Sequence, residues 1–315
     1  MTRVAVVGYA SRDHAMTVEE FLGTAGTTLV RRRLSCPWPG NGGVAYVLRA
    51  IAANGLAAQA VSWVGDDEDG AAWTADLRAA GVDVTGVSVV GERTPAAWLL
   101  YTSGGKTACI YDPGDCRPNG LTAVQRGIVH DADWCVVMAG PRAATRTVLA
   151  AHPPGSGLAW AVKNDPDAFP PDLVSALLAR ARVVTYGGDE HDFLAAAIAP
   201  RRVEDLVAAG CLLVETRGSR GVRWRSGARG GEVAVRRIDP RTPLGRETRF
   251  SALSSRLSRM TSSRPPRSSV GSPPRLACSP TEPQDVATDP SRDRGSAGTG
   301  LRRPGLPGRC LPLAD

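Results

Sequence analysis

The chain has 315 residues, 43% of them apolar and 5% aromatic, and its formal net charge is +7. This length allows one large α/β domain or two small ones. The sequence does not open with a charged segment followed by an apolar one, and no apolar run reaches membrane-spanning length. We therefore expect a cytoplasmic protein with no membrane partner.

The positive charge is concentrated in residues 241–315. That segment has 13 Arg, no Lys and 6 acidic residues, whereas residues 1–240 have 25 basic and 25 acidic residues. A protein that binds nucleic acid presents its basic residues as a patch or stripe on the folded domain. Because the body of this chain is neutral, we expect no nucleic-acid partner.

Cysteine and histidine are too scattered to form a structural framework. The seven cysteines include no CxxC pair, and the four histidines stand at no ligand spacing. A disulfide framework or a zinc site is therefore not expected, and the cysteines are predicted to be ordinary reduced thiols.

Short β-rich runs alternate with Ala- and Leu-rich helical runs through residues 1–240. In chain order we expect strands at 3–8, 59–64, 134–138, 158–162, 183–186 and 212–216, and helices at 44–54, 71–80 and 172–181. This alternation indicates a mostly parallel sheet with helices on both faces. Residues 241–315, with 12 Ser, 11 Pro and one aromatic residue, are predicted to be a disordered tail.

A glycine-rich turn, Pro-Gly-Asn-Gly-Gly-Val-Ala-Tyr at 39–46, leads into the helix expected at 44–54. Glycines let the backbone approach a ligand closely, and the start of the helix offers unpaired N–H groups. Gly55 follows, and Gly65 then opens the acidic turn 65–70. A plain turn before a helix and a solvated acidic turn are the alternatives.

Asp13 stands in a polar turn just after the first strand. It is a candidate substrate ligand, and a helix N-cap or turn residue is the alternative. Farther on, two β-rich runs around residues 102–105 predict a hairpin over 93–111, either part of a lid or a plain surface hairpin.

Two later turns each follow a strand. Tyr-Gly-Gly-Asp-Glu at 186–190 precedes a helix, which Glu190 could simply open. Thr-Arg-Gly-Ser-Arg-Gly at 216–221 is either an anion-binding turn or a generic hairpin turn.

Taken in order over about 240 residues, these motifs resemble the PfkB or ribokinase-like family of sugar and nucleoside kinases. The resemblance implies a three-layer α/β/α fold with a mostly parallel central sheet and a small β lid from about 29–34 and 93–111. It also implies ATP- and Mg²⁺-dependent phosphorylation of a hydroxyl on a small-molecule sugar or nucleoside, and it leaves a homodimer open.

Several residues match the family's substrate-binding positions. Asp13 stands where an aspartate accepts hydrogen bonds from substrate hydroxyls. The first signature of the family places Asn41, Gly42, Gly43 and Tyr46 beside the substrate. Tyr46 departs from the pattern, because the family often has Asn there, and Leu48 replaces a small residue.

Other residues match the nucleotide-binding positions. Glu190 matches the Glu of an Asn-x-x-Glu motif that organises Mg²⁺ indirectly, through water, although Gly187 replaces the Asn. Thr216, Gly218 and Gly221 match a Thr-x-Gly-x-x-Gly turn that lies against the nucleotide phosphates.

The family's second signature, Asp-Pro-Thr-Gly-Ala-Gly-Asp, is missing. Its last Asp removes the proton of the attacking hydroxyl, and its Gly-Ala-Gly amides stabilise the developing charge. After an expected strand at 233–238, Asp239-Pro240 are followed instead by Arg-Thr-Pro-Leu-Gly-Arg-Glu-Thr. Gly245 keeps a cofactor-binding position, but the position of the base falls on Thr248, so no catalytic residue is assigned.

The codons of a GC-rich gene offer an explanation. The chain has 36 Arg and 2 Lys. When Arg241 to Leu253 are read one base back, allowed third bases give Asp-Pro-Thr-Gly-Ala-Gly-Asp-Ala-Phe-Leu-Gly-Ala. We therefore infer a kinase domain at 1–240 followed by an out-of-frame tail at 241–315, whose basic charge is a by-product.

The missing catalytic base also determines which alternative functions must be considered. Impaired or absent turnover is expected for the chain as written, and a non-catalytic protein that retains sugar or nucleotide binding is the alternative. A Rossmann-type nucleotide-binding domain is disfavoured, because residues 8–13 lack the G-x-G-x-x-G turn.

Overall fold

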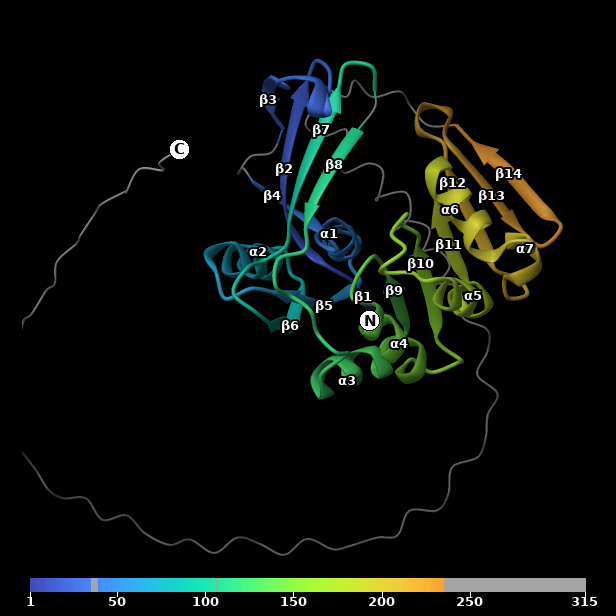
Figure 1. Ribbon diagram of the computed structural model, residues 1–315. Helices are drawn as coiled ribbons and strands as arrows, with labels where there is room; N and C mark the ends of the chain where they lie inside the picture. Colours follow the sequence, from blue (N-terminus) through green and yellow to red (C-terminus); the bar gives the residue numbers. More distant parts are fainter. Residues whose placement is uncertain (35–38, 106, 235–315) are drawn as a thin grey trace, which may run out of the picture. The chain divides into compact units, whose positions relative to one another are not determined.

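A computed structural model of the chain describes residues 1–34, 39–105 and 107–234 (Figure 1). The predicted tail, the expected strand 233–238 beyond Ala234, Gly245 and Thr248 lie outside this part. Of the helices in the described residues, none is long and apolar enough to cross a membrane.

The central sheet has nine strands. They are β1 (Arg3–Val7), β5 (Ala57–Val64), β6 (Asp83–Val89), β9 (Trp134–Val137), β10 (Gly157–Ala161), β11 (Val183–Tyr186), β12 (Leu212–Thr216), β13 (Val222–Ser226) and β14 (Arg229–Val233). Their spatial order is β14-β13-β12-β11-β10-β9-β1-β5-β6. The strands from β12 to β6 are parallel, and β13 and β14 add an antiparallel hairpin at one edge.

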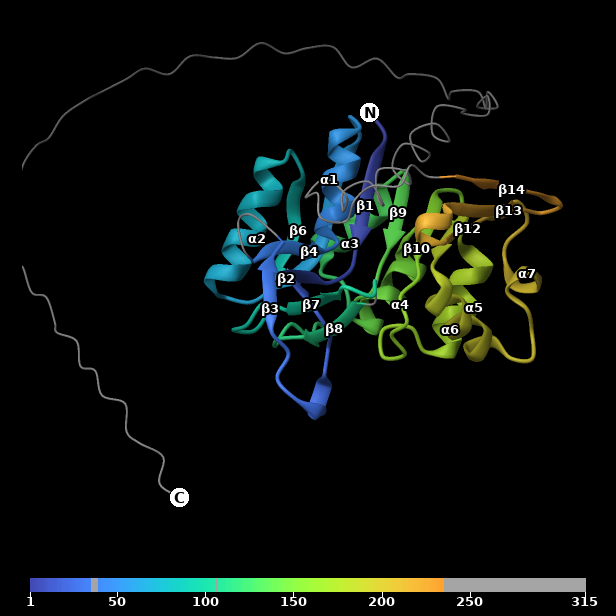
Figure 2. The ribbon, with the colours of Figure 1, turned by 90° about the horizontal axis from the view of Figure 1, so that it is seen from above.

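Seven helices connect these strands in the described part of the chain. They are α1 (Ala45–Ala53), α2 (Glu68–Ala79), α3 (Ala123–Asp131), α4 (Arg142–Ala151), α5 (Pro171–Arg180), α6 (Gly188–Ile198) and α7 (Val203–Leu206). Figures 1 and 2 show them on the two sides of the sheet. The predicted three-layer α/β/α fold with a mostly parallel sheet is therefore confirmed.

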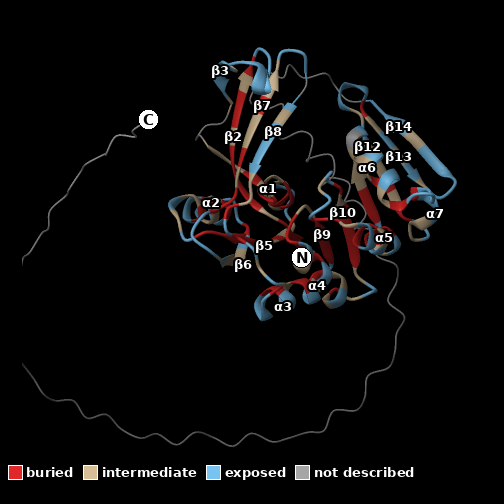
Figure 3. Ribbon diagram, in the orientation of Figure 1, coloured by how far each residue is buried: buried red, intermediate tan, exposed pale blue. Residues whose placement is uncertain are grey.

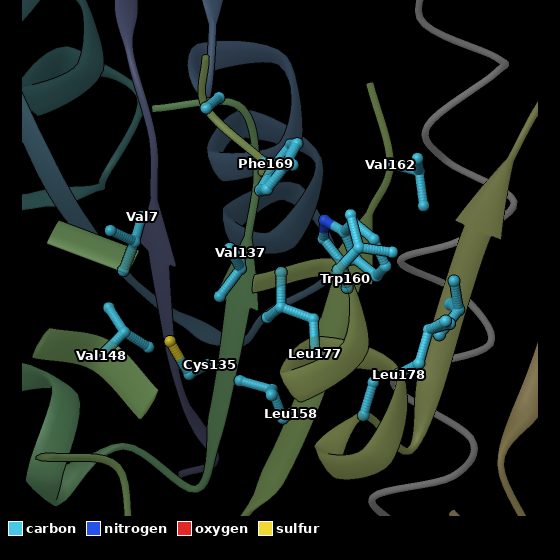
Figure 4. Close-up of a cluster of buried hydrophobic side chains, with 14 of the residues drawn as sticks. Val7, Cys135, Val137, Val148, Leu158, Trp160, Val162, Phe169, Leu177 and Leu178 are labelled. Carbon is cyan, nitrogen blue, oxygen red and sulfur yellow. The ribbon is translucent and has the colours of Figure 1, made fainter. Parts of the chain in front are cut away.

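Most residues of the inner strands are buried, as Figure 3 shows by colour. Successive residues point to opposite faces. Cys135 and Val137 of β9 join a cluster with Trp160 and helices α3 to α7, part of which is drawn in Figure 4. Trp134 and Val136 of the same strand join a second cluster with α1 and α2. This double burial explains why the strands appear in the sequence as continuous apolar runs.

A second, smaller sheet contains the segments expected to form a lid, and it is referred to as the lid. Its strands are β2 (Ala10–Val18), β3 (Val30–Arg33), β7 (Ala96–Thr102) and β8 (Thr107–Asp112), and β4 (Gly40–Gly43) pairs with the start of β2. The predicted hairpin around 102–105 joins β7 to β8, whereas the role of this sheet as a lid stays a prediction.

Two local predictions are wrong. Residues 10–13 are not a polar turn after the first strand, because they begin β2, the strand on which the lid is built. Polar residues are tolerated there because they are partnered: Ser11 Oγ donates to Asp13 at 2.7 Å, and Arg12 Nε lies 3.0 Å from Asp69. The glycine-rich turn likewise is largely the strand β4, paired with β2 from Ala10 to Asp13.

Candidate functional site

The parallel strands all end at the same edge of the central sheet, and ligands of α/β proteins bind at this carboxyl edge. Residues singled out from the sequence follow three of these strands. Asp13 comes six residues after β1, Glu190 follows β11, and the turn 216–221 follows β12. The lid strands β2, β7 and β8 rise from this same edge in Figure 1.

Asp13 is held from two sides inside the base of the lid. It is 5% exposed and accepts hydrogen bonds from Ser11 Oγ at 2.7 Å and from the Tyr46 hydroxyl at 3.1 Å. A Cβ at Gly42 would overlap the Asp13 carboxylate, and Gly43 has φ +61° against the Tyr9 carbonyl. Glycine at both positions is therefore what lets β4 lie against β2. The structure thus brings Asp13, Gly42, Gly43 and Tyr46 together.

Asn41 lies apart from this group. Its Nδ2 donates to Asp76 Oδ2 at 2.6 Å and reaches the Trp73 carbonyl at 3.4 Å, while its Oδ1 accepts from Arg12. Asp76 is also paired with Arg49 of α1. The Asn41 side chain therefore ties the lid base to α2 and does not turn to Asp13.

The acidic turn before α2 is structural. Asp67 caps α2 by accepting the Gly70 N–H at 2.7 Å, and it also accepts the Thr94 N–H at 2.8 Å and the Thr94 hydroxyl at 2.5 Å. Burial by itself would raise the pKa of Asp67, but the hydrogen bonds from Thr94 and Gly70 outweigh it and lower the pKa. The turn thus anchors the chain where it re-enters the lid.

Glu190 is the third residue of α6 after its cap at Gly187, in the first turn of the helix, and its side chain is only 18% exposed. Its Oε2 accepts the Gly187 N–H at 2.9 Å, and its Oε1 is 3.7 Å from Lys163 Nζ. A Cβ at Gly187 would lie 2.7 Å from that same Oε2. The carboxylate therefore occupies the space that a larger residue at 187 would use.

The turn after β12 is tight. A single 3-10 turn spans Gly218–Arg220, with φ +58° at Gly218 and +91° at Gly221. A Cβ at Gly221 would overlap the Val233 carbonyl, so the turn is pressed against β14. Thr216 Oγ1 donates to the Tyr186 carbonyl at 3.3 Å, which ties this turn to the strand preceding Glu190.

Mg²⁺ is usually held by one or two carboxylates together with water and substrate phosphates. Among the described residues no cluster of three His, Cys, Asp or Glu side chains could hold a metal by itself. A single well-placed carboxylate such as Glu190 therefore fits Mg²⁺ bound through water and phosphate better than an all-protein site.

Three further residues near these groups belong to none of the sequence motifs: Lys163, Tyr9 and Tyr111. Lys163 follows β10, and the Tyr9 and Tyr111 rings are 5.8 Å apart between the end of β1 and β8. Burial raises the pKa of Tyr9 to about 12, and Asp165 contributes to the shift. Position after a parallel strand was the signal available for Lys163 in the sequence.

A parallel sheet with candidate residues along its carboxyl edge and a β lid over it defines a ribokinase-like protein. The chain matches the model of the pfkB family carbohydrate kinases over residues 1–244, and it belongs to that family.

One curated relative is an ATP-dependent ribose-1-phosphate kinase of Halopiger xanaduensis, 28% identical over 134 residues. That alignment covers 42% of this chain and 44% of the relative, so the chain spans less than half the length of the curated relative it matches.

Solved structures show the same fold. A Methanocaldococcus jannaschii nucleoside kinase has a TM-score of 0.64 at 15% identity, covering 84% of this chain and 86% of that one. Cryptococcus neoformans ribokinase in complex with ADP has a TM-score of 0.63 at 16% identity, covering 76% and 80%. An uncharacterized Pyrococcus horikoshii sugar kinase in complex with ATP has a TM-score of 0.62 at 17% identity, covering 81% and 83%.

Proposed function

We propose that this protein derives from an ATP-dependent kinase that phosphorylates a hydroxyl of a small sugar or nucleoside, and that the chain as written binds these ligands with little or no turnover. The observation that carries the proposal is Asp13. This buried carboxylate sits at the lid base near the carboxyl edge, where ligands of this fold class bind.

Asp13 would hold the acceptor. Asp13 accepts hydrogen bonds from two hydroxyls of the chain, and its carboxylate could accept those of a substrate in the same way. Ser11 and Tyr46 fix its orientation, which lowers the cost of ordering it on binding. Gly42 and Gly43 let the backbone of β4 lie close to Asp13 on β2. Tyr46 supplies a hydroxyl group where the family often has an amide.

Thr216, Gly218 and Gly221 would lie against the nucleotide phosphates, through backbone N–H groups of a glycine turn. Glu190 would orient the water shell of Mg²⁺, and the ion neutralises phosphate charge when it is bound. Its existing bonds to Gly187 and Lys163 hold the carboxylate in place. The relatives solved with ADP and ATP support the choice of nucleotide.

Turnover needs a base for the acceptor hydroxyl. The position of the base falls on Thr248, which does not accept a proton at neutral pH, and of the Gly-Ala-Gly of the second signature only Gly245 remains. This loss favours a second candidate function, a binding protein without catalysis.

The proposed substrate site at Asp13 is tested by calorimetric titration with D-ribose, ribose 1-phosphate and adenosine. The natural chain should bind at least one of them, and Asp13→Asn should weaken that binding about tenfold or more, because one charged acceptor is lost. Asp131→Asn, on an exposed carboxylate at the end of α3, is the matched control and should change nothing. Equal affinity in the Asp13 and Asp131 variants would refute the assignment.

A further inference from the structure

Lys163 stands on an anchored loop at the carboxyl edge, two residues beyond β10. Asp165 Oδ1 accepts the N–H groups of Asp167 and Ala168 at 3.1 and 3.0 Å, and the Phe169 N–H donates to the Asp165 carbonyl at 2.9 Å. Phe169 is fully buried and packs edge-on against Trp160, with ring centroids 5.3 Å apart. The backbone beside Lys163 is therefore held by the core.

The ammonium group itself is accessible. The Lys163 side chain is 64% exposed, and its partner Glu190 is 18% exposed at 3.7 Å. An ion pair with one exposed partner at this distance contributes little to stability. Glu190 is also held by Gly187, whereas among the described residues Lys163 has one ion pair. The ammonium can therefore leave the carboxylate at small cost while the carboxylate stays in place.

Lys163 also lies within electrostatic reach of the lid. Burial raises the pKa of the Cys109 thiol on β8, Lys163 lowers it, and Asp13 raises it. One thiol therefore experiences the charges of both Lys163 and Asp13. Lys163 therefore lies beside Glu190, its ion-pair partner, and close enough to β8 of the lid for its charge to act on Cys109.

We propose that Lys163 binds the terminal phosphate of the nucleotide, its Nζ moving from Glu190 to the oxygens of the phosphoryl group that is transferred. The inference rests on the proposed function. Lys163 forms no covalent bond with the phosphate; it supplies positive charge between acceptor and leaving group, where phosphoryl transfer needs it.

Arg217 is less suited to this role, although it lies in the phosphate turn. Its guanidinium is paired with Glu232 at 2.7 Å, and its side chain is only 17% exposed. A phosphate would have to compete with a 2.7 Å contact of a largely buried guanidinium, whereas at Lys163 it competes with a 3.7 Å contact of an exposed ammonium.

The test is calorimetric titration of the full chain with ATP, AMP and tripolyphosphate. Lys163→Met should weaken ATP and tripolyphosphate about tenfold or more and leave AMP unchanged, because the lost charge meets the terminal phosphate. Lys163→Arg should retain most of the affinity. Arg182→Gln, which removes an exposed charge at the amino end of β11, is the control and should match the natural chain.

The results of these titrations distinguish the role of Lys163 from the existence of the proposed nucleotide site. The natural chain could bind ATP more tightly than AMP, and Lys163→Met could bind ATP equally well. In that case Lys163 only forms an ion pair with Glu190, so the inference fails and the proposed nucleotide site stands. If the natural chain binds neither ATP nor tripolyphosphate at millimolar concentration, the nucleotide half of the proposed function fails and the inference with it. Thermal melting of Lys163→Met should match the natural chain.

Discussion

The two faces of the central sheet differ in which part of the chain covers them. One face packs against apolar residues from five helices, α3 to α7. The other packs against apolar residues from α1 and α2, which belong to the β1, β5 and β6 side of the sheet. Yet β9 to β12 point apolar side chains toward this second face as well, including Val136, Ala159, Val183 and Leu212.

The difference bears on the proposed change of reading frame near Pro240. A mostly parallel sheet is stable only with both faces covered. Among the described residues, Val136, Ala159 and Val183 are buried on the second face, whereas Leu212 of β12 is only partly buried there. If the tail is out of frame, we expect restoring the frame to affect stability as well as catalysis.

The largest effect should come from restoring the alternate frame near Pro240. The restored segment would supply both the Gly-Ala-Gly-Asp turn and apolar helices for the second face. We expect ATP turnover to rise by about 10²–10⁴ from the base alone, and the free energy of unfolding to increase. Enzyme assays and thermal melting measure the two effects.

The control is the restored protein with its new aspartate changed to asparagine. This change should abolish phosphoryl transfer and leave the melting temperature nearly unchanged, because the side chain acts on the substrate and not on packing. A restored protein that gains neither turnover nor stability would make residues 241–315 a genuine C-terminus.

A smaller effect should distinguish the two faces of the central sheet within one strand, β12. Leu213 of β12 is 5% exposed in the first cluster, and its neighbour Leu212 points to the second face and is only partly buried. Leu213→Ala should cost about 2–4 kcal/mol, and Leu212→Ala about 1 kcal/mol. Urea unfolding measures both. Equal costs would show that the second face is covered as well as the first.

A pH effect should appear beside α4. His152 is 2% exposed, and its ring nitrogens have no hydrogen-bond partner among the residues that the structure describes. Burial, with a smaller effect of Arg180, lowers its pKa from 6.5 to about 4. Below pH 6.5 the unfolded chain gains a proton that the folded chain does not bind until about pH 4. Stability should therefore fall over this interval by up to about 3 kcal/mol, and stay unaffected above it.

Urea unfolding at pH 4.5 and pH 7.5 tests the sign of this effect. His152→Leu should flatten the dependence on pH, whereas His130→Leu should not, because His130 is 68% exposed. An unchanged slope in the His152 variant would assign the acid sensitivity to other groups.

Sequence reasoning succeeded where local pattern and tertiary environment agree. Residues 183–186 and 212–216 were predicted to the residue, because each is a short apolar run between polar ends and is buried on both faces. It failed for β2, where Ser11, Arg12 and Asp13 form a buried strand. Their partners come from distant elements, such as Asp69 and Tyr46, which a local pattern cannot reveal.

The candidate site residues show the same division. Asp13 is proposed from its position after the first strand, and the structure adds its partners Ser11 and Tyr46, which the sequence could not reveal. Asn41 is proposed from the first signature of the family, and in the structure its side chain turns toward Asp76. Lys163 carries no motif, and its position between Glu190 and the lid depends on how three separate strands assemble.

The central claim is that this pfkB-family chain has lost its catalytic aspartate to a change of reading frame near Pro240. The most direct measurement is the DNA sequence of codons 238–253, read one base back. The account predicts third bases that spell Asp-Pro-Thr-Gly-Ala-Gly-Asp across Arg241 to Thr248. Third bases that spell other residues at the glycines or at the final aspartate would contradict it.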